Sequence, residues 1–91
     1  MSGVVVLQFW SPTCGPCTAI KPALEDLKDE FEGKILWVSV NTHQDSEGYA
    51  SRLQVKVVPT IVVLKNDVEV GRYSGTQIAI FYALIRKGLA A

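Results

Sequence analysis

The sequence predicts an α/β fold with the element order β-α-β-α-β-β-α and a mixed sheet. An uninterrupted apolar run at Val4–Trp10 predicts a strand that is covered on both faces and is therefore central in its sheet. Apolar residues at helical spacing follow as far as Phe31, and a second apolar stretch after them predicts a parallel β-α-β crossover. Alternation of apolar and polar residues after residues 60–64 predicts an antiparallel hairpin, so both kinds of strand pairing are expected.

The first helix is expected from near Cys14 to Phe31, because apolar residues recur there every three or four positions between charged ones. Pro22 falls inside this helix and removes the hydrogen bond to the carbonyl of Thr18, so we expect a kink. Gly33 is expected to end the helix. The positions that should face the core are Ile20, Leu24, Leu27 and Phe31.

Three shorter elements are expected in the middle of the chain. Residues 35–40 form a second strand, and a polar stretch then enters a short helix over residues 45–53, with Tyr49 and Leu53 as its apolar contacts. Residues 60–64 are β-branched and continuous, which predicts a buried third strand. Turn-forming residues follow this strand and lead into the second strand of the hairpin.

A last helix is expected after the hairpin. Thr76 has the side chain of an N-cap residue, and Gly88 is expected to lie beyond the C-terminal end of this helix. The side chains that should face the sheet are Ile78, Phe81, Tyr82 and Ile85.

Length and composition predict a single domain over residues 1–91. Nine acidic residues balance nine basic ones, so no net field attracts nucleic acid or an anionic membrane, and neither partner is expected. The first residues lack the basic region and cleavage site of a signal peptide, and no apolar run approaches the ~18 residues of a membrane span. We therefore expect a cytoplasmic protein that uses its two cysteines for chemistry.

The two cysteines lie in the segment Cys14-Gly15-Pro16-Cys17, at the predicted start of the first helix. Residues three positions apart fall on one helix face, so the two sulfurs are close enough to form and break a disulfide. A thiol at a helix N-terminus faces the positive end of the helix dipole, which favours the reactive thiolate. The pattern favours thiol-disulfide exchange, while half of a zinc site and a structural disulfide remain alternatives.

Together with Phe9 and Trp10, the cysteine segment resembles the active-site segment of the thioredoxin family. The resemblance continues through Pro22, Val58-Pro59-Thr60 and Gly75 in family order, so it covers nearly the whole chain. It implies the minimal thioredoxin fold, a four-stranded mixed sheet with helices on both faces. It also implies a thiol-disulfide oxidoreductase that reduces protein disulfides and receives electrons from a reductase such as thioredoxin reductase.

By this resemblance Cys14 is the exposed nucleophile that forms the mixed disulfide, and Cys17 is the resolving thiol that releases the reduced substrate. No cofactor and no metal are required. A zinc site that included His43 would have only three ligands within the chain, so this histidine is interpreted as a solvated loop residue.

The resemblance also implies a surface for the substrate. The Val58-Pro59 peptide is expected to be cis and to face the disulfide, with the Val58 backbone presented to an extended substrate. Gly75 is expected beside the substrate groove, where a side chain would obstruct approach. The remaining positions implied in substrate binding, which surround the cysteines, are Trp10, Thr13, Gly15 and Pro16.

Three substitutions depart from the family pattern. Thr13 stands where a tryptophan usually precedes the first cysteine, so an apolar contact surface is lost. Gln8 replaces a buried aspartate that is thought to relay the proton of the resolving thiol, and Ser39 replaces its usual lysine neighbour. A glutamine amide does not titrate in the working pH range, so Cys17 is expected to lose its proton to water.

The strand and helix that usually precede the active-site strand are also expected to be absent, since three residues stand before Val4. The strand at residues 35–40 would then be an open edge that carries Leu36 and Trp37 and is able to pair with a second copy. Minimal folds of this type commonly stay monomeric, and a monomer is expected.

Two alternative functions differ in class. A glutaredoxin-like, glutathione-coupled enzyme is disfavoured because Gly15-Pro16 is not the Pro-Tyr of glutaredoxins and no Gly-Gly-Asp loop follows the hairpin. A non-catalytic interaction module with the same fold is disfavoured by the intact Cys14 and Cys17.

Overall fold

The structure is a computed structural model that describes residues 2–91. Met1, the first residue of the segment in which no signal peptide is predicted, lies outside the described residues. The order of its elements is the predicted one. They are β1 (Val4–Trp10), α1 (Gly15–Glu30), β2 (Leu36–Asn41), α2 (Tyr49–Arg52), β3 (Thr60–Lys65), β4 (Val68–Ser74) and α3 (Ile78–Ala90).

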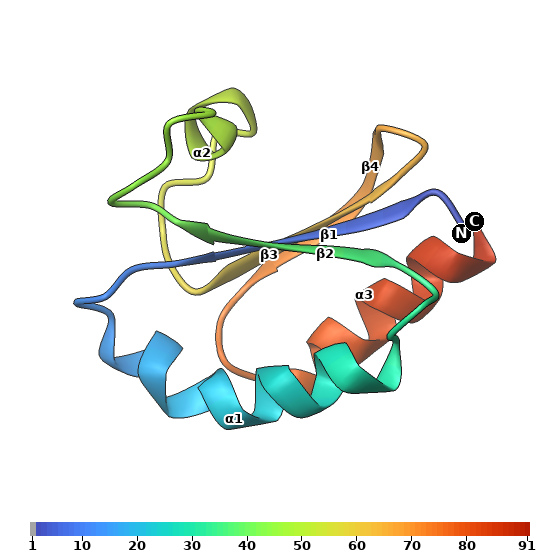
Figure 1. Cartoon of the computed structure of the whole chain (residues 1–91), viewed down its shortest axis with the longest axis horizontal. Coiled ribbons are helices and arrows are strands. Elements are labelled where there is room, and N and C mark those ends of the chain that lie inside the picture. Colours follow the sequence, from blue (N-terminus) through green and yellow to red (C-terminus); the bar gives the residue numbers. More distant parts are fainter. Residues whose placement is uncertain (1) are drawn as a thin grey trace.

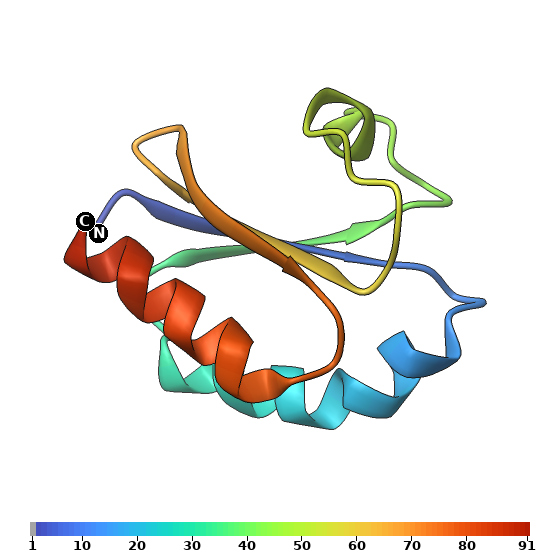
Figure 2. The ribbon, with the colours of Figure 1, turned by 180° about the vertical axis from the view of Figure 1, so that it is seen from behind.

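The four strands form one mixed sheet in the order β2-β1-β3-β4. Strand β1 pairs in parallel with β2 and antiparallel with β3, which in turn pairs antiparallel with β4. Helices α1 and α3 cover one face of the sheet, and the short α2 covers the other (Figure 1). The view from behind shows the same layers (Figure 2). The expected fold, including the central position of β1, is confirmed.

Alternate side chains of β1 enter the two halves of the core. Val4 and Val6 pack in the cluster beneath α1 and α3, whereas Leu7 and Phe9 pack in the cluster beneath α2. Because successive side chains of a strand point to opposite faces, both faces of β1 need apolar residues. This is why the run shows no alternation, and it places the side chain of Gln8 on the same face as Val4 and Val6.

The middle of the chain differs from the expectation in its boundaries. Strand β2 begins and ends one residue later than predicted, and α2 spans only Tyr49–Arg52 instead of residues 45–53. Gly48 has a left-handed backbone with φ of 70°, so a helix cannot run through it. The Asp45 carboxylate accepts hydrogen bonds from the Tyr49 and Ala50 N–H groups and so caps the helix from outside.

The hairpin turn between β3 and β4 uses a positive φ at both Asn66 and Asp67, 51° and 70°. Two-residue turns of type I′ require a positive φ at both central positions. Asn66 and Asp67 suit these positions because asparagine and aspartate tolerate the left-handed region. Arg72 in β4 pairs with Glu69 and donates to the Leu53 carbonyl at 2.8 Å, which ties the hairpin to the end of α2. The hydrogen bond from Arg72 lowers the pKa of the Glu69 carboxyl.

Two predictions about the last helix are wrong. Helix α3 begins at Ile78 with Gln77 as its N-cap, so Thr76 does not cap it. The Gln77 N–H donates instead to the Tyr73 hydroxyl at 3.2 Å. Gly88 does not lie beyond the helix but inside it, buried against the sheet. A Cβ at Gly88 would lie 2.8 Å from Val63 Cγ1, so close packing and not helix termination explains this glycine.

Strand β2 is an edge of the sheet, as predicted, and the Leu36 side chain on it is 48% exposed. The monomeric state stays a prediction. In residues 2–91, none of the helices combines the length and the apolar character needed to cross a bilayer.

The contact of Gly88 with the sheet predicts that Gly88→Ala lowers stability. Overpacking a core typically costs about 1–3 kcal/mol, which exceeds the gain of about 1 kcal/mol that alanine brings to a helix. For a domain of this size each kcal/mol changes Tm by about 4–8 °C, so thermal unfolding measures the effect. The exposed Ala83→Gly in the same helix is the control for propensity alone. A Tm above that of the parent protein for Gly88→Ala would contradict the packing explanation.

Candidate active site

A tight turn connects the end of β1 to the start of α1. The buried Ser11 organises it, because its Oγ accepts a hydrogen bond from the Thr13 N–H at 3.2 Å and its carbonyl accepts one from the Cys14 N–H at 3.1 Å. The Thr42 N–H donates to the Trp10 carbonyl at 2.9 Å and ties the end of β2 to the same turn. The turn therefore delivers Cys14 to the first position before the helix.

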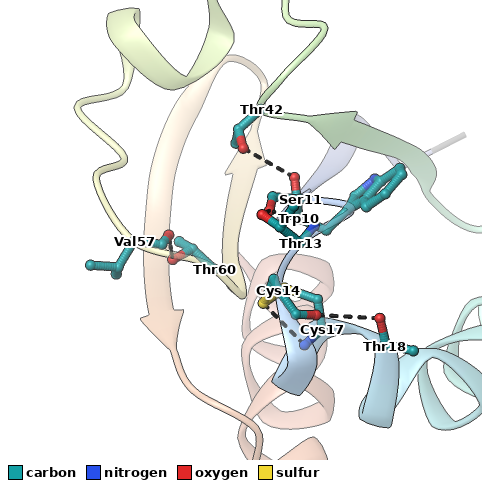
Figure 3. The surroundings of a disulfide bond; sticks show 9 residues. All are labelled: Trp10, Ser11, Thr13, Cys14, Cys17, Thr18, Thr42, Val57 and Thr60. Carbon is teal, nitrogen blue, oxygen red and sulfur yellow. Dashed lines mark hydrogen bonds between the residues drawn. A yellow bond between two sulfur atoms is a disulfide. The ribbon is translucent and has the colours of Figure 1, made fainter.

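Cys14 and Cys17 form a disulfide with their Cα atoms 5.3 Å apart (Figure 3). Cys14 is the N-cap residue of α1, and its Sγ accepts a hydrogen bond from the Cys17 N–H at 3.1 Å. Cys14 is partly exposed, whereas Cys17 is buried with 7% of its surface exposed. The two cysteines thus differ in their exposure to solvent and in the hydrogen bond that the Cys14 sulfur accepts.

Gly15 and Pro16 form the exposed start of α1 between the cysteines. A proline in the first helical turn loses no hydrogen bond, because the first N–H groups of a helix have no partner within it. Pro22 lies inside the same helix, which continues through it to Glu30. The expected kink stays a prediction.

The loop before β3 is held by three hydrogen bonds. The Thr60 hydroxyl donates to the Val57 carbonyl at 2.7 Å and lies 2.7 Å from the Ser74 hydroxyl, while the Gly75 N–H donates to the Pro59 carbonyl at 3.1 Å. The Val58-Pro59 peptide bond is cis. These bonds join the loop to the connection between β4 and α3. In the view of Figure 3, Val57 and Thr60 lie on the opposite side of the disulfide from Trp10.

Gly75 has a φ of 150°, and a Cβ there would overlap the Tyr73 hydroxyl. The close approach of this tyrosine is sufficient reason for a glycine at this position. A role of Gly75 beside the substrate stays a prediction.

Gln8 and Trp10 continue the inner face of β1 beyond the core. The Gln8 Oε1 accepts a hydrogen bond from the Trp37 indole N–H at 3.0 Å, and the Trp10 indole donates to the Ser39 Oγ at 2.8 Å. Gln8 and Ser39 are direct partners in the pairing of β1 with β2. The position of the family's buried acid is therefore filled by an amide whose oxygen is already bonded.

His43 is exposed, and its backbone N–H donates a hydrogen bond to the Asn41 Oδ1 at 2.9 Å. Over residues 2–91, no three His, Cys, Asp or Glu side chains are gathered closely enough to hold a metal ion.

Three residues of the site were not singled out from the sequence. Ser11 sits where a serine hydroxyl commonly bonds the backbone two residues on, which is a local signal that was available. The bonds of Trp37 to Gln8 and of Tyr73 to the Gln77 N–H depend on strand register and loop path, so no local pattern indicates them.

Comparisons with known proteins agree with this geometry. The family model for thioredoxin matches residues 1–86. Over 81 residues the chain is 37% identical to a thioredoxin of Haemophilus influenzae, a match that covers 85% of this chain and 75% of that protein. A chloroplastic thioredoxin M5 of Oryza sativa is 40% identical over 62 residues, which are 68% of this chain and 36% of the relative.

The solved structure of Fasciola hepatica thioredoxin superimposes with a TM-score of 0.86 at 30% identity, covering 96% of this chain and 82% of that one. With a disulfide-bonded Cys-x-x-Cys pair at a helix start, the fold and site define a thiol-disulfide oxidoreductase. The chain belongs to the thioredoxin family, and its class of activity is that of a protein-disulfide reductase.

The neutral amide of Gln8 predicts the effect of restoring an acid. Gln8→Asp should raise the rate of disulfide reduction near neutral pH, because a carboxylate on this face is able to accept the proton of Cys17. It should also lower the free energy of unfolding by about 1–3 kcal/mol, since it places a carboxyl at a half-buried position where it forms no direct ion pair across the strands, and breaks the bond with Trp37.

Gln8→Asn is the matched control, because it has the length of aspartate without its titration. Rates of reduction over a pH series and denaturant unfolding measure the two effects. An identical pH-rate profile for Gln8→Asp and Gln8→Asn would rule out proton transfer at this position.

Proposed function

We propose that Cys14 attacks the substrate disulfide and that Cys17 resolves the mixed disulfide. The observation that supports these roles is the asymmetry of the two sulfurs. Cys14 caps the helix and is partly exposed, whereas Cys17 lies one turn further on and is buried. A partly exposed sulfur is accessible to a second protein, and the hydrogen bond from the Cys17 N–H favours its anionic form.

The reaction is a two-step exchange. The Cys14 thiolate attacks one sulfur of the substrate, which breaks the substrate disulfide, forms a mixed disulfide and releases the other substrate sulfur as a thiolate. The Cys17 thiolate then attacks the Cys14 sulfur and releases the second substrate thiolate, leaving the Cys14–Cys17 disulfide. Two electrons pass to the substrate, and solvent supplies the two protons that its thiolates take up.

The substrate is proposed to bind across the loop before β3. Val58, Pro59 and Gly75 belong to the two connections that hydrogen bonds tie together beside the disulfide. Val57 is 58% exposed and adds an apolar side chain to this loop. The proposed contacts on the other side, which surround the cysteines, are Trp10, Thr13, Gly15 and Pro16.

We further propose that disulfide-containing proteins are the substrates and that a reductase such as thioredoxin reductase regenerates the dithiol. Membership of the family supports both proposals, because thioredoxins in general reduce disulfide substrates and are reduced by a reductase. A monomeric state and a cytoplasmic location belong to the same proposal.

Reduction of insulin by dithiothreitol tests the function. The parent protein should accelerate the precipitation of the insulin chains, and Cys14→Ser should abolish the acceleration because the remaining thiol, Cys17, is buried and is not accessible to the insulin disulfides. Ala19→Ser is the control, since it places the same side chain at an exposed position of the same helix.

The non-catalytic alternative predicts equal rates for the parent protein and Cys14→Ser, and that result would overturn the proposal. Turnover with NADPH and a thioredoxin reductase, compared with turnover with glutathione and its reductase, identifies the donor. Preferential turnover with glutathione would favour the glutaredoxin-like alternative.

A further inference from the structure

A groove of about 330 Å³ lies beside the active site, between α1 and the strands β1 and β2. Cys17 lines it, although only 7% of the Cys17 surface is exposed. A space of this size holds on the order of ten water molecules at about 30 Å³ each. The groove therefore brings solvent to the buried Cys17 residue from the side of the sheet.

The strand side of the groove carries no charge. Gln8 and Ser39 line it together with two tryptophans, and the hydrogen bonds of Gln8 with Trp37 and of Trp10 with Ser39 are made within this wall. The turn adds Ser11 and Pro12, which are also uncharged. The loop across the disulfide, from Val57 to Thr60, contains no ionisable side chain.

All the charged side chains that line the groove come from α1, and they are Lys21, Glu25 and Lys28. Lys21 follows Cys17 by four residues, so the two share a helix face and lie about 6 Å apart along the axis. Helical side chains lean toward the N-terminus of their helix, so the general direction of a side chain at position 21 is toward the turn that contains Cys17. The salt bridge found among residues 2–91 joins Arg72 and Glu69. Within these residues the Lys21 ammonium therefore forms no salt bridge with a carboxylate.

We propose that Lys21 stabilises the thiolate of Cys17 through the groove and thereby speeds the resolving step, in a site that lacks a buried acid. The rate of attack by Cys17 follows its thiolate fraction, which a nearby cation raises. Lys21 acts through Cys17 and does not itself react. The proton of Cys17 leaves to water in the groove. This inference rests on the resolving role of Cys17 proposed above.

The thiolate of Cys17 is measurable by itself in the Cys14→Ser variant, because the sequence contains two cysteines. Ultraviolet absorbance of the thiolate over a pH series gives its midpoint without a reagent that must enter the groove. Lys21→Gln in this background should raise the midpoint of Cys17 ionisation by about 0.5 pH unit. At pH values below the midpoint, this shift is roughly a threefold loss of thiolate. The expected shift is small because solvent weakens the interaction of an exposed lysine. High salt should reduce the difference.

Lys28→Gln is the matched control. It removes the same charge from the same helix face and the same groove, but it lies about 16 Å from Cys17 along the helix. The shift that Lys28→Gln causes in the midpoint of Cys17 ionisation should be less than about a third of the shift caused by Lys21→Gln. Glu25→Gln should move the midpoint in the opposite direction, because it removes a negative charge from the groove.

In the two-cysteine protein, Lys21→Gln should slow release of the reduced substrate about threefold near neutral pH, and the difference should vanish once Cys17 is fully ionised. An unchanged midpoint for Lys21→Gln, or equal shifts for Lys21→Gln and Lys28→Gln, would overturn the inference. A failure of the proposed function is seen separately, as loss of the difference between the parent protein and Cys14→Ser in insulin reduction.

Discussion

The hydrogen bond from the Cys17 N–H to the Cys14 Sγ is the interaction on which the chemistry of this protein depends. It exists because a helix begins immediately after Cys14, which leaves backbone donors unpaired at the point where this sulfur lies. The helix dipole adds to the same effect. The cap therefore makes two chemically equal thiols different, and this difference is the basis of the order of attack and release that we propose for the exchange reaction.

The central strand β1 positions this cap and also supplies the wall beneath it. Its outer-face residues Leu7 and Phe9 are fixed under α2, and Val4 and Val6 are fixed under α1 and α3. Gln8 and Trp10 continue the second set beyond the core, where they meet Trp37 and Ser39 of β2. This neutral, hydrogen-bonded wall lines the same groove as Cys17, and the charged side chains of that groove come from α1.

Patterns that depend on local spacing were sufficient to predict the element order and the cysteine pair. Val4–Trp10 is a continuous apolar run because both of its faces are buried, and the helix through Leu24 has a regular apolar spacing because one of its faces is buried. The errors lie where contacts distant in sequence decide the structure. Gly88 has the sequence pattern of a helix end but is explained by its contacts with Val63 and Val4 of the sheet. The helix begins one residue later than a Thr76 cap requires, and the Gln77 N–H donates to the Tyr73 hydroxyl of β4.

Alkylation of the fully reduced protein tests the inequality of the two thiols most directly. With limiting iodoacetamide near neutral pH, peptide mapping should find the label on Cys14 first. The rate of Cys14 labelling should rise with pH about a midpoint below the ~8.5 of a free thiol. Labelling of Cys17 before Cys14, or a Cys14 midpoint at or above that of a free thiol, would contradict the account.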